Sequence, residues 1–180
     1  MSELLAMLNA KPGNYQAMPA GGVPDITPEM VSAACCGLTR HVYLYALYKF
    51  AGQEDVLREL WALNRAAVKR RAILQKWNIQ LQHLCCVGDL ADSVLAEALT
   101  ENRCLLCKGA GVNDRMKRCP ACQGSGNGKR WSARKRARNI GISHTTFRNT
   151  WAVRYADCFR EFGYFDKIID QEIRYQLFSG

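Results

Sequence analysis

Residues 104–126 read CLLCKGAGVNDRMKRCPACQGSG and contain two C-x-x-C pairs that are separated by 11 residues. The four cysteines are Cys104, Cys107, Cys119 and Cys122. Two residues between paired cysteines allow a tight turn that directs both sulfurs at one point, and two such turns supply four thiolates for a closed tetrahedral Zn²⁺ site. Gly109 and Gly124 can supply the positive φ that such turns often need. The stretch therefore predicts a small zinc-ribbon-like four-cysteine module over residues 102–128 that holds one structural zinc ion.

Two alternative interpretations of these cysteines are disulfides within the pairs and a dithiol redox site. Disulfides would leave this polar, glycine-rich piece almost without a core, and so small a segment could hardly fold without a metal. Metal binding contributes on the order of 10 kcal/mol or more in such modules. The N-terminus, MSELLAMLNAKPG, has no positively charged start and no long apolar block, so we expect no signal peptide, and the cysteine count of nine is odd. Both features favour reduced thiols and a metal site over a disulfide framework.

Positive charge is concentrated in and after the cysteine stretch. The 180 residues carry 25 Lys/Arg and 16 Asp/Glu, a net charge of +9. Residues 102–155 hold 13 of these bases and a single acid, Asp114, so the rest of the chain is mildly acidic. A basic module beside a nearly neutral body indicates a polyanionic partner, although a merely solvated surface is the alternative. No apolar run approaches the length of a membrane span, so we expect a cytoplasmic protein with no membrane partner.

The fold class predicted from the whole chain is mainly α, a helical bundle body with the four-cysteine module inserted and a helix-turn-helix-like segment after it. The order of features predicts five segments. They are a flexible N-terminal arm (1–26), the helical body (27–101), the four-cysteine zinc-binding insertion (102–128), the basic helix-turn-helix-like segment (129–156) and a C-terminal helical tail that packs on the body (157–180).

Capping residues set the expected helix boundaries. Thr27, followed by Pro28, predicts a helix that continues to Phe50 before Gly52. A second helix is expected to follow from Gln53. Asp89 is expected to cap a third helix that ends near Thr100. In the tail, Gly163 is expected to separate two short helices.

The segment after the cysteines matches a helix-turn-helix pattern. Ser132 and Ser143 are good N-caps for two successive helices, and Gly141 between them can take a left-handed φ in the turn. The small Ala137 lets the helices approach, and Phe147 begins an inward-facing line that continues through Trp151 and Tyr155 at intervals of four. The alternative interpretation is a pair of basic amphipathic helices without this geometry.

In the helix-turn-helix interpretation, the two helices divide the contacts to DNA. The second helix presents side chains that suit base edges in the major groove: Ser143, His144, Thr145, Thr146, Arg148 and Asn149. The first helix and its lead-in supply phosphate contacts: Lys129, Arg130, Arg134, Lys135, Arg136 and Arg138. The sequence contains no paired carboxylates, no nucleophile with a matched base and no phosphate-binding glycine loop, so we do not expect an enzyme.

The order of these features resembles the Q transcription antitermination proteins of lambdoid bacteriophages, of the lambda type with an internal zinc-binding insertion. CLLCKGAG and CPACQGSG are followed by a basic helix pair that contains ARNIGISHTTF, and the resemblance is specific over residues 100–160. It implies that the four cysteines bind zinc and that the helix from Ser143 to Asn149 lies where the family binds DNA.

The resemblance further implies a protein of the bacterial host cytoplasm that binds promoter DNA, engages paused host RNA polymerase holoenzyme with its sigma factor, and lets the polymerase read through terminators. Two alternatives stay open. One is a zinc-containing helix-turn-helix repressor or activator without antitermination. The other is a zinc module like that of DnaJ chaperones, or a dithiol oxidoreductase, although the chain has no His-Pro-Asp signature.

Overall fold

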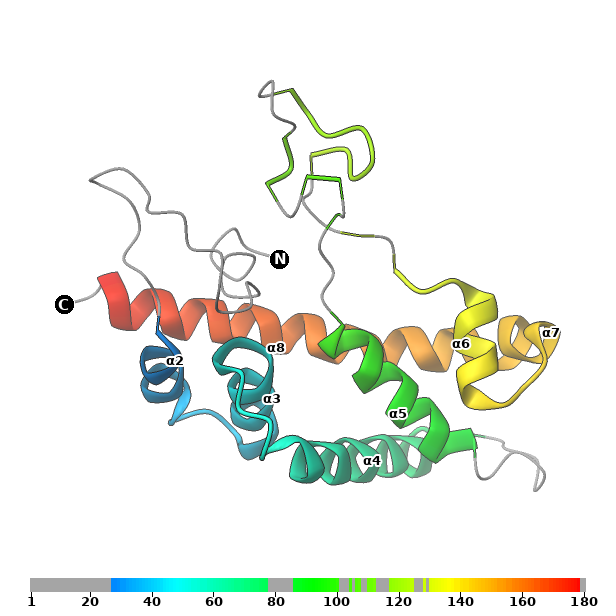
Figure 1. Ribbon diagram of the computed structural model, residues 1–180. Coiled ribbons are helices and arrows are strands. Elements are labelled where there is room, and N and C mark those ends of the chain that lie inside the picture. The colour runs from blue at the N-terminus through cyan, green and yellow to red at the C-terminus, as the bar shows by residue number, and fades with distance from the viewer. Residues whose placement is uncertain are drawn as a thin grey trace. The chain divides into compact units, whose positions relative to one another are not determined.

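The computed structural model describes residues 27–77, 86–100, 104, 106–107, 110–112, 117–124, 128 and 130–178. For residues 177 and 178 it describes the backbone only. Within these ranges the regular structure is helical, and the mainly α prediction is confirmed. The helices are α2 (Pro28–Cys35), α3 (Arg40–Ala51), α4 (Leu57–Leu74), α5 (Cys86–Leu99), α6 (Ala133–Ile140), α7 (His144–Thr146), the π-helical turn η2 (Phe147–Trp151) and α8 (Ala152–Phe178) (Figure 1). Among them, none is both long enough and apolar enough to cross a membrane.

The described chain divides into two compact units whose boundaries fall within α4 and α8. One unit contains residues 27–60 and 163–178. Its core includes Tyr45 of α3 and Phe165 of α8, whose rings meet edge to face at 5.7 Å. Asp166 accepts hydrogen bonds from the Tyr45 hydroxyl (3.1 Å) and from Lys49 Nζ (2.9 Å). These contacts fix the C-terminal part of α8 against α3.

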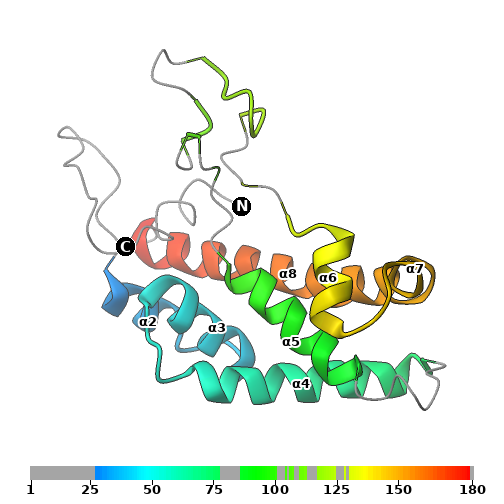
Figure 2. The same cartoon turned by 45° about the vertical axis from the view of Figure 1, so that its right-hand side comes forward.

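The second unit, Trp61–Phe162, contains the candidate site. In it α5 contacts both α4 and α6 (Figures 1 and 2). The buried Asn64 amide of α4 donates to the Ala91 carbonyl of α5 at 2.6 Å. Arg71 of α4 forms an ion pair with Glu161 of α8 at 2.6 Å. The unit is therefore held by polar contacts between helices as well as by its apolar core.

Two predicted helix boundaries were wrong because packing outweighs the local signals. The expected helix from Thr27 to Phe50 is interrupted after Cys35, and a turn that includes Gly37 lets α2 and α3 pack on each other. Gly163 does not break α8, which continues through it. Phe162 and Phe165, on either side of this glycine, are buried. The free energy gained by burying their side chains exceeds the cost of about 1 kcal/mol for a glycine inside a helix.

The start of α5 also differs from the prediction. The helix begins at Cys86, so Asp89 lies in its first turn instead of capping it. Cys86 and Val87 are buried, and this burial favours the additional helical residues. Asp89 still stabilises the positive end of the helix dipole from its place in the first turn.

Candidate metal centre and nucleic-acid interface

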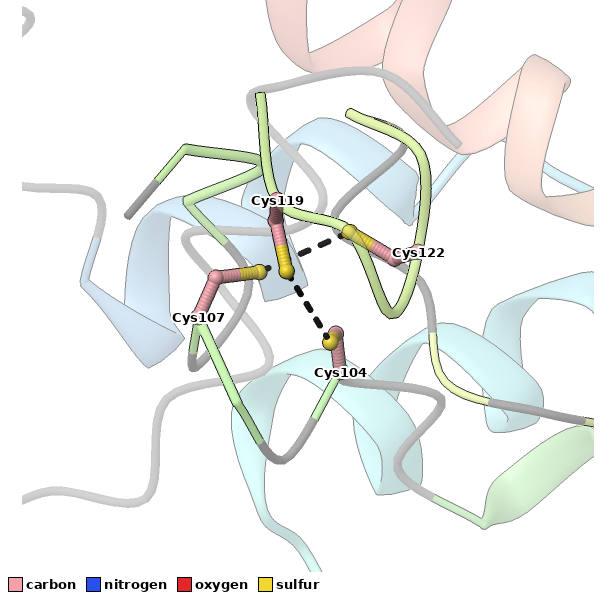
Figure 3. Close-up of side chains that lie close together, drawn as sticks. All are labelled: Cys104, Cys107, Cys119 and Cys122. Atoms are coloured by element: carbon pink, nitrogen blue, oxygen red, sulfur yellow. Dashed lines mark hydrogen bonds between the residues drawn. The ribbon is translucent and has the colours of Figure 1, made fainter. Parts of the chain in front are cut away.

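Four cysteine side chains converge on one point in the second unit (Figure 3). Their Sγ atoms all lie within 4.8 Å of one another, with Cys104 and Cys119 3.8 Å apart and Cys107 and Cys122 3.6 Å apart. A disulfide needs about 2.05 Å, whereas a tetrahedral ion with metal–sulfur bonds of about 2.3 Å separates its sulfurs by about 3.8 Å. The cysteines are free thiols. Their arrangement could therefore hold one tetrahedral metal ion, as the C-x-x-C spacing predicted.

The backbone after the first pair supports this arrangement. The Gly111 amide donates to Cys107 Sγ at 3.3 Å, and the Gly111 carbonyl accepts from the Cys119 amide at 2.8 Å. Val112 and Arg118 form an antiparallel bridge. The residues that follow the first cysteine turn thus lie antiparallel to those that precede the second, and the amide–sulfur bond orients a ligand atom as outer partners do in metal sites.

The second turn depends on a glycine. Gly124 has a φ of +84°, as predicted, while Gly109 lies outside the described residues. A Cβ at Gly124 would come within 2.8 Å of Arg118 Nε, and that atom donates to the Gln123 carbonyl at 2.7 Å. Glycine is favoured by the positive φ, and a larger residue here would also displace the Arg118 side chain.

The surroundings of Cys104 favour its thiolate form. The pKa of Cys104 is lowered, first because the Cys107 amide donates to its sulfur and further because the Leu106 amide does the same, while burial acts in the opposite direction. Cys104, Cys107 and Cys119 are buried, and Cys122 is half-buried. Since thiolates and not thiols bind metals, this environment suits a metal site.

The helix-turn-helix segment has the predicted caps and turn. Ser132 Oγ accepts from the Lys135 amide at 3.3 Å, and Ser143 Oγ accepts from the Thr146 amide at 3.0 Å. Gly141 between the helices has a φ of +73°, the left-handed conformation that the turn requires. The caps at Ser132 and Ser143 are therefore confirmed.

The second helix of this segment packs through the predicted line of aromatic residues. Phe147, Trp151 and Tyr155 are 2%, 1% and 0% exposed. Ala137 of α6 is also buried, which allows the close approach of the two helices. The residue pattern indicated one helix from Ser143 through Tyr155, but it indicated neither the π-helical turn η2 within this helix nor its continuation to Phe178.

A buried carboxylate that the sequence analysis did not single out fixes α6 in place. Glu97 of α5 is 0% exposed and accepts from Arg136 Nε (2.9 Å) and Nη2 (2.6 Å). It also accepts from the Tyr155 hydroxyl (2.8 Å) and the Trp131 amide (3.2 Å). Burial raises the pKa of Tyr155 above its usual value, which keeps the hydroxyl protonated as a donor. The one available signal was an acid at a core position of the stretch VLAEAL.

This network corrects one predicted residue. Arg136 was expected to contact phosphate, but its guanidinium is bonded to Glu97, and that bond raises the pKa of Arg136. Its neighbours Arg134 and Lys135 have the same charge but are exposed. Arg136 therefore holds α6 on α5, and we no longer assign it to DNA.

The other predicted DNA contacts gather on the two helices. Lys129 lies outside the described residues, and the remaining cations of the first group are exposed: Arg130, Arg134, Lys135 and Arg138. On the second helix the exposed residues are Ser143, Thr145, Arg148 and Asn149, while His144 and Thr146 are half-buried. Aromatic rings hold two of the cations: Arg130 lies 5.0 Å from the ring centre of Phe159, and Lys135 lies 3.9 Å from that of Trp131. The surface combines exposed cations with exposed polar side chains.

Comparison of the chain with protein-family models, with curated proteins and with solved structures found no match.

Proposed function

We propose that this chain is a DNA-binding regulator of transcription whose four-cysteine site holds one structural zinc ion. The observation that carries the proposal is the α6–turn–α7 geometry, with Gly141 in the turn and Phe147 buried on the inner face of the second helix. This geometry leaves Arg148 and Asn149 exposed near the start of that helix. The N-terminal residues of the second helix are those that reach base edges in helix-turn-helix proteins.

Zinc is the ion that best fits the cysteine cluster. Four thiolates in a tetrahedron suit zinc or an iron–sulfur centre, and closed sites of this kind with C-x-x-C spacing are structural zinc sites. Zinc bound to Cys104, Cys107, Cys119 and Cys122 would stabilise a small module that has little apolar core of its own.

The charges on the surface account for affinity and the polar side chains for sequence choice. Arg130, Arg134, Lys135 and Arg138 are placed to neutralise phosphates, so four contacts predict a decrease of log K with log salt of slope about −3 to −4. Asn149 suits adenine because its amide can both accept and donate on one base edge, as Arg148 suits guanine by donating twice.

Antitermination is the specific form of regulation that we propose. Its support is the resemblance of residues 100–160 to the lambda-type Q proteins. The partners would be double-stranded promoter DNA and the holoenzyme of a bacterial host RNA polymerase with its sigma factor, acting in the host cytoplasm on phage late genes. A repressor or activator would use the same DNA surface, so transcription through a terminator separates these two functions.

Binding selection from a randomised duplex library, followed by titration at several salt concentrations, tests the DNA-binding proposal. Asn149→Ala is expected to lose about 1–3 kcal/mol of discrimination at one base position. Arg134→Ala is expected to weaken all sequences alike and to reduce the salt slope by about 1. Lys167→Ala, an exposed cation in the other unit, serves as the control. Identical effects of Asn149→Ala and Arg134→Ala on every sequence would remove the base-reading role.

A further inference from the structure

Val153, in the first turn of α8, is 71% exposed although its neighbours Trp151 and Tyr155 are 1% and 0% exposed. Val153 therefore belongs to the outer face of the second helix of the helix-turn-helix segment, not to its core. A branched apolar side chain on that face cannot pair with a phosphate, so the basic surface does not explain it.

The outer face of this helix presents Thr145, Asn149 and Val153 at intervals of four residues, and all three are exposed. In an α-helix a step of four residues overshoots one full turn, whereas in a π-helix, with its larger hydrogen-bonded ring, the same step falls short of one turn. The π-helical turn η2 (Phe147–Trp151) lies in the middle of this run. The overshoot of the α-helical steps and the shortfall of the π-helical steps therefore offset each other. The three side chains thus form one straight line along the helix.

This line is opposite the buried one. Each of its members is offset by two residues from Phe147, Trp151 or Tyr155, which is about 200° around an α-helix. From Thr145 to Val153 the line covers about 12 Å of helix, comparable with about three to four base pairs at about 3.4 Å each.

The residues around Val153 suit close approach to DNA. Ala152 and Ala156 on either side are small and at least partly exposed. One step further along the line is Asp157, which pairs with Arg160 at 3.2 Å. Its carboxylate would repel phosphates, so the surface that suits DNA ends after Val153.

We propose that Val153 is a specificity-determining residue that contacts the 5-methyl group of a thymine in the major groove. This inference rests on the proposed DNA binding. Apolar side chains recognise thymine by this methyl group, the one apolar feature that a base edge presents in the groove. Thr145 and Asn149 would read adjoining bases, and Val153 extends the reading surface by one helical turn.

The test uses the full chain with zinc and the duplex obtained by selection with the unaltered protein. Each thymine is replaced in turn by deoxyuridine, which removes the methyl group and keeps every hydrogen-bonding group, and affinity is measured by fluorescence anisotropy. One replacement is expected to weaken the unaltered protein about fourfold, the effect of one buried methyl group. Val153→Ala should bind the thymine duplex less tightly and lose this sensitivity to the methyl group. Ile73→Ala, a variant of an apolar residue with similar exposure (76%) in α4, should keep it.

The outcomes separate this inference from the proposed function. If no sequence is enriched, DNA binding itself is refuted and this inference falls with it. If a sequence is enriched but no thymine methyl matters, or if the sensitivity persists in Val153→Ala, only the role of Val153 is refuted. Unchanged affinity of Val153→Ala for every duplex would likewise refute a contact between Val153 and DNA.

Discussion

Replacing Glu97 by glutamine tests whether the buried carboxylate holds α6 in place. The change removes the charge that receives two hydrogen bonds from Arg136 and one from Tyr155. Breaking a buried ion pair at one partner costs about 3–5 kcal/mol. The Arg136 side chain keeps 21% exposure and regains some hydration, so we expect the lower end of this range, about 3 kcal/mol.

The assay is urea unfolding followed by tryptophan fluorescence, with excess Zn²⁺ throughout. All four tryptophans lie in Trp61–Phe162, so the signal reports on the unit that contains Glu97. With an m-value of about 1.5 kcal/mol per M, Glu97→Gln should lower the midpoint by about 2 M. Asp92→Asn is the matched control because it breaks the half-exposed pair with Arg65, which contributes about 1 kcal/mol or less. A midpoint for Glu97→Gln no lower than that of Asp92→Asn would refute the reasoning.

Three further predictions address the metal site, the other unit and the turn. Cys119→Ser removes a metal ligand and should weaken zinc binding at least about 100-fold, because even the loss of an outer hydrogen-bond partner costs about 10–100-fold. Cys36→Ser, a change of an exposed cysteine, should keep one ion per chain, and native mass spectrometry measures both variants. Lys49→Met alone should destabilise the chain by about 2–3 kcal/mol, while Lys49→Met with Asp166→Leu should be near neutral in urea unfolding. Because burial lowers the pKa of Lys49, this residue binds more protons in the unfolded chain than in the folded chain between that pKa and about 10.5. Over this range the stability of the unaltered chain should therefore rise with pH relative to that of the double variant. Gly141→Ala should cost about 1 kcal/mol through its φ of +73° alone, since no atom lies within 4 Å of the added Cβ, and circular dichroism on heating should show this loss.

The features that the sequence predicted correctly depend on residues close together in the chain. Ser132 and Ser143 cap helices through amides three residues later, and Gly141 is required by its own φ. The C-x-x-C spacing predicts the two cysteine turns, and the Val112–Arg118 bridge lies between them in the sequence. Such local interactions can be identified by spacing and residue type alone.

The features that the sequence did not predict depend on contacts between distant residues. Glu97 and Arg136 are 39 positions apart, and Arg136 carries the same charge as Arg134. Only burial distinguishes the arginine that holds α6 from one that is exposed. Similarly, Gly163 is a helix breaker by type, but the buried aromatic residues on either side of it keep α8 continuous.

Transcription through a terminator measures the central claim most directly. The template carries the selected DNA sequence in a promoter followed by a terminator, and read-through by purified bacterial holoenzyme is compared with and without the zinc-loaded chain. We predict that the chain raises read-through on this template, that a scrambled binding sequence abolishes the gain, and that Asn149→Ala reduces it. DNA binding at the promoter with no change in read-through would contradict antitermination and leave an ordinary regulator of initiation.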